Sequence, residues 1–357
     1  MLPKLLIAAS GTGGHLFPAI ATAEELADYQ LEWLGVPDRL ETQLVPKRYP
    51  LHTIGVEGFQ QRLGLGTVRV LGKLAGSVGQ VRKLLRQGDF QGVFTTGGYI
   101  AAPAILAARS LGLPAILHES NALPGKVTRL LSPLCSTVAL GFEAAAIYLP
   151  RAKTVWVGTP VRPQFLVAPA NLPPLHLPIP PDAPLIVVVG GSQGAVAVNN
   201  LVRQSAAAWF DAGAWVVHLT GDSDPDAKQL IHPQYFPLPF YDNMAALFRR
   251  ATLAISRAGA GTLTELAVAH LPAVLIPYPF AAEDHQTANA QIFATTGAAK
   301  LFQQADLTAT RLETEVLELL RSPHLDQMAD AMAKLALTDS SSRLAQLIRT
   351  IVSHATS

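Results

Sequence analysis

The stretches "KLLIAASGTGGH" (Lys4–His15) and "PLIVVVGGSQGA" (Pro184–Ala195) begin the two halves of the chain in the same way. Each is an apolar run, typical of a strand buried on both faces, that leads into a glycine-rich turn and then a helical pattern. A strand, a glycine-rich turn and a helix are the opening of a Rossmann-like domain. The repeat therefore predicts two such domains, with ligands at the carboxyl ends of their strands.

Strand-like runs alternate with helical patterns along the rest of the chain, which predicts α/β domains with parallel sheets covered by helices. The stretch "VAPANLPPLHLPIPPDAP" (Val167–Pro184) has too much proline for a helix or a central strand and is interpreted as the interdomain connection. We predict a first domain over residues 1–163, a second over 164–340, and a final helix over 341–357. The expected strands are Leu5–Ala9, Leu31–Leu34, Gly92–Thr95, Ala115–His118, Thr154–Val157, Leu185–Val189, Trp215–Leu219, Leu253–Ser256 and Ala273–Pro277.

Composition excludes several classes of protein. Of the 357 residues, 49% are hydrophobic and 15% are charged, with a net charge of +1, so the excess of basic residues that nucleic-acid binding needs is missing. The single cysteine, Cys135, rules out an intramolecular disulfide and a cysteine metal cluster, and it fits a reducing compartment. The sequence also lacks a signal-peptide pattern and an apolar run long enough for a membrane span.

The first glycine-rich turn favours an anion over a dinucleotide. A dinucleotide fingerprint needs G-x-G-x-x-G, but Leu16 stands where the third glycine is required, which argues against an NAD oxidoreductase. Unpaired amides at a helix N-terminus still suit a phosphate or an oxyanion. His15 in this turn is either a hydrogen-bonded cap or a catalytic group.

Four later stretches combine strand ends with polar or glycine-rich turns. "FTTGGYIAAP" (Phe94–Pro103) repeats the first device, and "SRAGAGTLTEL" (Ser256–Leu266) opens a helix whose amides can face a diphosphate. Glu265 in that helix either binds ribose hydroxyls or complements the helix dipole. In "PFAAEDHQTANA" (Pro279–Ala290), Gln286 suits sugar hydroxyls, the alternative being a solvated helix start. The D-x-D of "GDSDPD" (Gly221–Asp226) is more typical of a turn than of a metal site.

The motifs together resemble a known family. "SGTGGHLFPAIA", "TGGYIAAP", "HESNALPGKVTRLL", "GTPVR", "GGSQGA", "SRAGAGTLTEL" and "EDHQTANA" occur in the order in which the bacterial MurG glycosyltransferases have them, from Leu5 to about Ala298. The resemblance implies a GT-B fold, with two Rossmann-like domains whose parallel sheets face one another across a cleft and a last helix that returns to the first domain. It also implies inverting transfer of N-acetylglucosamine from UDP-GlcNAc to lipid I, which gives lipid II in peptidoglycan synthesis.

The family's functional positions carry over residue by residue. The resemblance implies acceptor binding in the first domain, at Thr12, Gly13, Gly14, His15, Gly97, Gly98, Tyr99, Glu119 and Asn121. Our hypothesis for the catalytic base is His15, because an imidazole can accept a proton near neutral pH, and Glu119 is its rival. The resemblance also implies a set of donor-binding positions, which are Thr12, Gly13, Gly14, Asn121, Arg162, Ser192, Gln193, Tyr241, Met244, Ala260, Gly261, Thr262, Leu263, Thr264, Glu265 and Gln286. No metal or other cofactor is expected. Two departures, Thr159 for asparagine and Ala102 for glycine, affect interdomain packing and acceptor fit.

A lipid acceptor also implies an anionic membrane surface as a partner. Between Gly58 and Gly88 the chain has no acidic residue, and basic and apolar residues alternate at helical spacing there; these are Arg62, Arg69, Lys73, Arg82, Lys83 and Arg86 with Val68, Leu71, Leu74, Val78, Val81 and Leu85. The alternative is that the apolar stripe faces the sheet. We expect a peripheral protein at the cytoplasmic face of the bacterial plasma membrane, with wall-synthesis proteins as further partners. Competing functions are a UDP-GlcNAc 2-epimerase and a catalytically silent nucleotide-sugar-binding protein.

Overall fold

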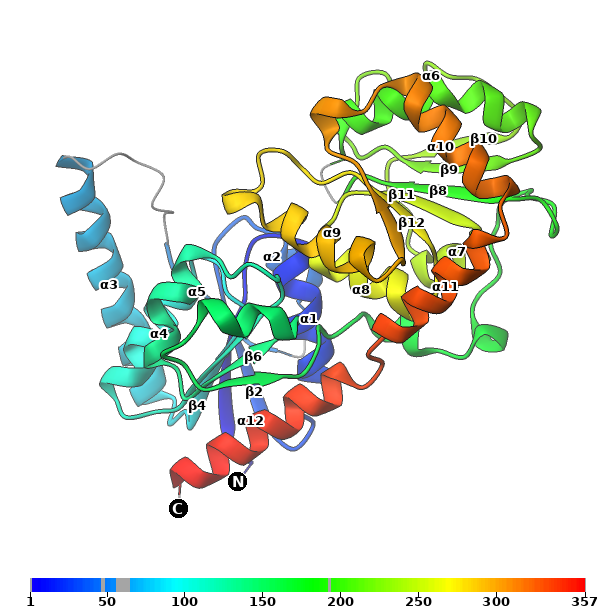
Figure 1. The fold of residues 1–357 in the computed structure, drawn as a ribbon. Coiled ribbons are helices and arrows are strands. Elements are labelled where there is room, and N and C mark those ends of the chain that lie inside the picture. Colours follow the sequence, from blue (N-terminus) through cyan, green and yellow to red (C-terminus); the bar gives the residue numbers. More distant parts are fainter. Residues whose placement is uncertain (1, 46–48, 56–64, 192–193, 357) are drawn as a thin grey trace. The chain divides into compact units, whose positions relative to one another are not determined.

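The computed structural model describes residues 2–45, 49–55, 65–191 and 194–356. The chain divides into two compact units, the first formed by Met1–Arg162 with Asp339–Ser357 and the second by Pro163–Thr338. Each unit contains one parallel sheet with helices on both faces (Figure 1). The chain is therefore an α/β protein with two Rossmann-like domains, as the repeated opening predicts.

The first unit is built on a seven-stranded sheet in the order β3-β2-β1-β4-β5-β6-β7. Its strands are β1 (Lys4–Ala8), β2 (Gln30–Gly35), β3 (Leu51–Thr53), β4 (Gly92–Thr95), β5 (Ala115–Glu119), β6 (Thr137–Leu140) and β7 (Thr154–Trp156). Its α-helices are α1 (Gly13–Glu24), α2 (Glu41–Leu44), α3 (Leu65–Gln87), α4 (Ala101–Ser110), α5 (Lys126–Leu131) and α12 (Ser340–Thr356).

The apolar run of β1 is buried on both faces of this sheet. Leu6 and Ala8 lie in one core cluster with side chains from α3 and α4. Leu5 and Ile7 lie in a second cluster with side chains from α1 and α12. Since successive side chains of a strand point to opposite faces, a continuous apolar run is what a doubly covered strand requires.

The final helix, α12, packs on the first unit. Leu344, Ile348 and Val352 are fully or almost fully buried in the cluster that also holds residues of α1. Arg349 adds a two-pronged ion pair, donating from Nε and Nη2 to the Asp28 carboxylate at 2.9 and 2.7 Å. The resemblance anticipates this return of the chain to the first unit.

The second unit has a six-stranded parallel sheet in the order β10-β9-β8-β11-β12-β13. Its strands are β8 (Leu185–Val189), β9 (Trp215–Leu219), β10 (Tyr235–Leu238), β11 (Leu253–Ser256), β12 (Ala273–Leu275) and β13 (Ala299–Leu301). Its α-helices are α6 (Val196–Asp211), α7 (Met244–Arg250), α8 (Ala260–Val268), α9 (His285–Thr295), α10 (Ala309–Arg321) and α11 (His324–Leu335). The proline-rich stretch belongs to this unit, where Asn243 Nδ2 donates to Pro173 O at 3.0 Å and Arg250 Nη2 to Ala183 O at 2.8 Å.

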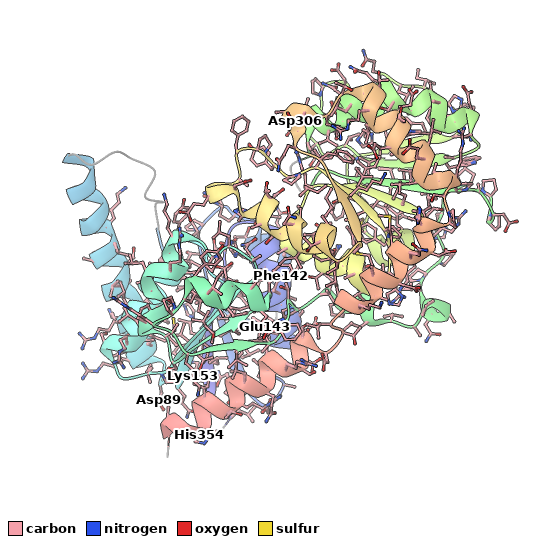
Figure 2. The ribbon with its side chains drawn as sticks, in the orientation of Figure 1. Asp89, Phe142, Glu143, Lys153, Asp306 and His354 are labelled. Atoms are coloured by element: carbon pink, nitrogen blue, oxygen red, sulfur yellow. The ribbon has the colours of Figure 1, made fainter. Side chains whose placement is uncertain are left out.

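The order of the strands indicates where each sheet binds ligands, which is at the carboxyl ends of its central strands. In the first unit, Asp89 and Lys153 precede β4 and β7, whereas Phe142 and Glu143 follow β6 and lie nearer the opposite edge (Figure 2). Strand order reverses between β1 and β4 in the first unit and between β8 and β11 in the second. Open parallel sheets bind ligands beyond the carboxyl ends of the strands at such a reversal.

The apolar stripe of α3 lies in the core. Val81 and Leu85 are 0% and 1% exposed, and Val78 packs against the same cluster. The interpretation of these three residues as a membrane-contacting stripe is therefore wrong, because α4 covers them. Arg82, Lys83 and Arg86 are exposed. Arg62 and the side chains of Val68, Arg69 and Leu71 lie outside the described residues.

Candidate active site

His15 lies at the start of α1 and is held by the turn that follows β4. Its Nδ1 lies 2.7 Å from the carbonyl oxygen of Thr96, and Thr96 Oγ1 donates to the backbone oxygen of His15 at 2.9 Å. A carbonyl oxygen only accepts, so Nδ1 carries the proton and Nε2 of the neutral ring has a free lone pair. No described group hydrogen-bonds to Nε2. The ring is thus oriented as a proton acceptor.

Two glycines let the imidazole lie against the second turn. Gly97 and Gly98 have φ angles of +91° and +73°, in the left-handed region that disfavours side chains. A Cβ at Gly98 would lie 3.6 Å from Nε2 of His15, and one at Gly97 would lie 3.6 Å from Cε1. Tyr99 follows directly and is 46% exposed. The ends of β1 and β4 therefore bring His15, both glycines and Tyr99 together.

The N-terminus of α1 offers backbone amides beside this histidine. Thr12 is the N-cap, and its carbonyl accepts the first hydrogen bond of the helix, from His15 N at 3.1 Å. The amides of Gly13 and Gly14 precede that bond and have no intrahelical acceptor. A Cβ at Gly13 would approach the Phe17 ring to 2.7 Å, and the Arg162 guanidinium lies 5.0 Å from the centre of the same ring. Amides and a cation near one turn suit an anionic group.

Glu119, the rival base, is occupied by its own loop. Oε1 accepts from the backbone and side-chain nitrogens of Asn121, both at 3.0 Å. Oε2 accepts from Thr128 Oγ1 at 2.7 Å and from Gly125 N at 3.3 Å. A carboxylate with four donors organises the loop after β5 and has little capacity left for a substrate proton. The geometry therefore favours His15 as the base.

The neighbouring strand end contains a neutral histidine and an unpaired hydroxyl. Burial lowers the pKa of His118, whose Nε2 donates to Gly158 O at 2.9 Å. Among the described side chains, Thr159 Oγ1 is the buried polar atom that lacks a partner. Gly141 contacts this hydroxyl so closely that a Cβ there would overlap it. The departure from asparagine thus lies in a tightly packed turn beside Glu119.

In the second unit, the start of α8 exposes backbone amides of the kind that can bind a diphosphate. Gly259 is the N-cap, and its carbonyl accepts from Leu263 N at 3.0 Å, so the amides of Ala260, Gly261 and Thr262 have no intrahelical acceptor. Thr264 Oγ1 is turned back to Ala260 O at 2.9 Å. Glu265 is 7% exposed and stands beyond the first turn, where the helix dipole has weakened. This position favours the ribose role over dipole compensation.

Gln286 joins two strand ends of the same unit. Its Oε1 accepts from Tyr278 N at 2.9 Å and from Ala258 N at 3.2 Å. These two donors fix which end of the amide is oxygen, so Nε2 points its hydrogens away from them. No described group accepts from Nε2, which leaves it available to a sugar hydroxyl.

Replacing Gln286 with glutamate is expected to weaken donor binding while keeping the fold. The carboxylate still accepts from both amides, but it loses the Nε2 donor and adds a negative charge near the diphosphate amides of α8. We expect KM for UDP-GlcNAc, the donor that the resemblance implies, to rise about 10-fold, as loss of one hydrogen bond and added repulsion imply. Steady-state kinetics measures this, with Gln304→Glu as a matched control; an unchanged KM would contradict the sugar-binding role.

Arg257 was not predicted and supports this edge of the sheet. It is 7% exposed, and its Nη1 donates to Ile276 O and Pro277 O at 3.0 and 2.9 Å. Burial lowers its pKa. Its guanidinium thereby fixes the loop that carries Tyr278 and Gln286. An arginine directly after a buried strand was the available signal in the sequence.

Gly194, which follows β8, packs against the end of β9. Ser192 and Gln193 lie outside the described residues. Gly194 has a φ of +75°, and a Cβ there would overlap Thr220 O. Asn199 Nδ2 donates to the same oxygen at 2.9 Å. The two strand ends are therefore held together by backbone contact and one amide.

The D-x-D stretch forms part of a buried network. Asp224 accepts from Arg203 Nη1 and from Asn199 Nδ2, each at 2.7 Å. In the described part of the chain, no three His, Cys, Asp or Glu side chains are grouped to hold a metal. Asp224 thus has a structural partner, which agrees with the turn interpretation.

Tyr241 and Met244 lie near the start of α7 in the same unit. Burial raises the pKa of Tyr241, and Met244, the first residue of α7, is 5% exposed.

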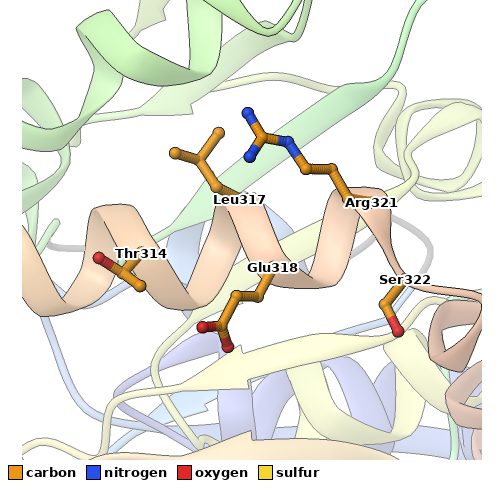
Figure 3. A pocket seen from close by; sticks show the side chains of 5 residues that line it. All are labelled: Thr314, Leu317, Glu318, Arg321 and Ser322. Atoms are coloured by element: carbon orange, nitrogen blue, oxygen red, sulfur yellow. The ribbon is translucent and has the colours of Figure 1, made fainter.

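A shallow surface pocket lies elsewhere, along α10, and contains none of the predicted residues (Figure 3); its lining is Thr314, Leu317, Glu318, Arg321 and Ser322. The predicted ligand-binding residues therefore lie near the ends of the strands and not in this pocket.

Comparisons with known proteins agree with these motifs. The glycosyltransferase family 28 N-terminal domain matches residues 5–140, and its C-terminal domain matches residues 185–344. The chain belongs to the MurG group of glycosyltransferase family 28. A relative from Nostoc punctiforme, named UDP-N-acetylglucosamine–N-acetylmuramyl-(pentapeptide) pyrophosphoryl-undecaprenol N-acetylglucosamine transferase, is 69% identical over 98% of both chains. One from Trichodesmium erythraeum with the same name is 62% identical over 98% of this chain and 93% of its own.

Solved structures share the fold of this family 28 enzyme. The crystal structure of Acinetobacter baumannii MurG superposes with a TM-score of 0.78 at 31% identity, covering 98% of this chain and 99% of that one. The calicheamicin glycosyltransferase CalG4 has a TM-score of 0.73 at 15% identity over 99% of each chain, which shows the fold alone. The chain is thus a glycosyltransferase with the GT-B type of domain pair.

Proposed function

We propose that this glycosyltransferase moves N-acetylglucosamine from UDP-GlcNAc to undecaprenyl-diphospho-N-acetylmuramoyl-pentapeptide, which converts lipid I into lipid II. Relatives that match the whole chain are named for this transfer. The observation that carries the chemistry is the hydrogen bond of 2.7 Å between His15 Nδ1 and Thr96 O, which leaves Nε2 as a proton acceptor. The epimerase and the silent binding protein are not favoured, because these relatives are named as transferases.

We assign one substrate to each of the two units. The first unit binds the lipid-linked acceptor, and the second binds UDP-GlcNAc. The acceptor hydroxyl attacks the anomeric carbon opposite the UDP, its oxygen forms the new bond, and its proton passes to Nε2 of His15. The bond from that carbon to the phosphate oxygen breaks, and its electron pair leaves with UDP. The free amides of α8 and the Arg162 cation stabilise the departing charge, and Glu265 binds the ribose.

Amides and an arginine can stabilise UDP without a metal ion, so we propose that catalysis needs none. The test is transfer of labelled N-acetylglucosamine to a lipid I analogue, with EDTA and with an acceptor-free control. Acceptor-dependent lipid product that survives EDTA supports both proposals. UDP release without acceptor would favour an epimerase or a hydrolase, and loss of product with EDTA, restored by Mg²⁺, would overturn metal independence.

We also propose that the first unit binds an anionic membrane at the cytoplasmic face. Across the described residues, no helix combines the length and apolar character needed to cross a bilayer. Arg82, Lys83 and Arg86 of α3 are exposed, and α4 contacts both α3 and α5. Leu130 of α5 is 77% exposed, and nearby Leu134 is 36% exposed. Exposed leucines beside basic residues suit an anionic lipid surface. Wall-synthesis proteins would be further partners there.

Reversing the charges of Arg82, Lys83 and Arg86 to glutamate is expected to weaken binding to anionic vesicles at least 10-fold. Each basic residue near the surface contributes about 1 kcal/mol, and reversal adds repulsion. Vesicle sedimentation with and without phosphatidylglycerol measures this. The matched control reverses Arg311, Arg321 and Lys334 in the second unit and is expected to leave binding unchanged. Equal sedimentation of both variants and the parent would argue against this surface.

A further inference from the structure

Glu41 is a buried carboxylate to which neither the motifs nor the proposed mechanism gives a role. It is the first residue of α2 and is 0% exposed. Its Oε2 accepts from Gly11 N at 3.2 Å, and its Oε1 accepts from Val36 N at 2.7 Å. No described cation pairs with it. The side chain therefore joins the turn after β1 to the end of β2 through backbone amides alone.

Burying this carboxylate is costly, which makes its placement informative. Removing a carboxylate from water is unfavourable unless donors compensate, and here two backbone amides do so. The end of β2 provides the room, because a Cβ at Gly35 would approach Glu41 Cγ to 2.7 Å. An apolar side chain would fill such a position without the desolvation cost, but it would leave Gly11 N and Val36 N without this acceptor.

The exit of β1 is fixed at three successive points. Ala9 N donates to Leu34 O at 3.2 Å, and Trp33 Nε1 donates to Ala9 O at 2.9 Å. The Glu41 carboxylate then accepts from Gly11 N. Gly11 has a φ of +104°, and the next residue, Thr12, is the N-cap of α1. The direction in which α1 begins, and with it the position of His15, depends on this sequence of bonds.

We infer that Glu41 is a positioning residue for the transfer reaction. It holds Gly11, and through Gly11 it sets the amides of Gly13 and Gly14 and the His15 imidazole against the Gly97–Gly98 turn. The inference rests on the proposed function, since it assigns Glu41 to the same acceptor site. Glu41 itself touches no reacting atom. Its contribution is therefore to the rate of the bound complex and not to the affinity for UDP-GlcNAc.

The test is Glu41→Gln in the full-length protein. The amide keeps one acceptor oxygen, but its NH2 group then faces a backbone N–H, so either Gly11 N or Val36 N loses its partner and the link between the turn and β2 is broken. We expect kcat to fall 10- to 100-fold, with the Kd for UDP-GlcNAc unchanged within 2-fold. The matched control is Glu32→Gln, which removes another largely buried carboxylate, on β2, that binds Lys4 and His52 at 2.5 and 2.6 Å and does not touch the turn. This control should lose stability while keeping kcat.

Glu41→Asp provides the second variant. Its shorter carboxylate places no donor against the turn, so kcat should lie between the values of the parent and Glu41→Gln. Equal kcat, per folded molecule, of the parent and Glu41→Gln would overturn the positioning role. If Glu41→Gln does not fold, Glu41→Asp decides in the same way: a lowered kcat at normal UDP-GlcNAc affinity supports the role, and a parental kcat overturns it. Failure of the proposed function is distinct, because the unsubstituted protein would then form no lipid II.

Discussion

Replacing His15 with alanine is expected to lower kcat about 100- to 10,000-fold, the usual contribution of a general base. The substitution removes the Nε2 acceptor, while the free amides of α8 that we assign to UDP lie in the other unit. The Kd for UDP-GlcNAc should therefore stay within about 2-fold of the parent, as expected when an interaction of the reaction step is lost. Single-turnover transfer to a lipid I analogue, with calorimetric titration of UDP-GlcNAc, measures both quantities.

Thr96→Val is the matched control for this experiment. It removes the hydroxyl that donates to His15 O at 2.9 Å but keeps the carbonyl that orients Nδ1 at 2.7 Å. Because the imidazole and its tautomer remain, kcat should fall less than 10-fold. Near-normal turnover by His15→Ala with intact binding would remove His15 from the role of base. A large loss in Glu119→Gln under the same conditions would then favour the rival carboxylate.

The longer, wholly apolar strands could be predicted from the sequence, and four short strands could not. Runs such as Leu185–Val189 are apolar throughout because they are covered on both faces, and that pattern is visible in one dimension. β3, β6, β10 and β13 were missed. They have three or four residues each, and Thr137–Leu140, for example, gains its strand character from pairing with β5. Short segments carry too little periodicity to indicate such pairing.

The candidate site could be predicted as a set of residues, but their roles depend on contacts between distant parts of the chain. The orientation of His15 is set by Thr96, 81 residues away, and no spacing rule links the two. Glu119 looks like a base in the sequence, and only its bonds to Asn121, Gly125 and Thr128 reveal a carboxylate that organises a loop. Similarly, the helical stripe of α3 indicates an amphipathic helix without saying whether protein or lipid covers it.

Asp224→Asn is expected to destabilise the folded protein by about 3–5 kcal/mol, the usual cost of leaving one partner of a buried ion pair alone. The carboxylate is fully buried and accepts from Arg203 at 2.7 Å, and the side-chain amide of asparagine would turn a donor or a weaker acceptor toward that guanidinium. Urea unfolding followed by circular dichroism measures the loss. Asp28→Asn is the matched control, because its pair with Arg349 has side chains 51% and 34% exposed and should be worth at most about 1 kcal/mol. Equal losses in the two variants would contradict the argument from burial.

The pH dependence of stability should distinguish the contribution of Asp224 from that of His218, a histidine in the same network. Burial raises the pKa of Asp224, but hydrogen bonds from Arg203 and Asn199 outweigh it and lower the pKa below 3.8. The stability it adds is therefore complete above pH 3.8 and is lost as the pH falls through the folded value. Burial lowers the pKa of His218 to about 3, so its protonation in the unfolded chain starts to cost stability below pH 6.5. That cost reaches about 1.4 kcal/mol per pH unit in parent and variant alike. The difference in free energy of unfolding between the parent and Asp224→Asn should thus stay constant from pH 7 to 5 and narrow only below pH 4. If this difference instead disappears between pH 7 and 5, the ion pair is not its source.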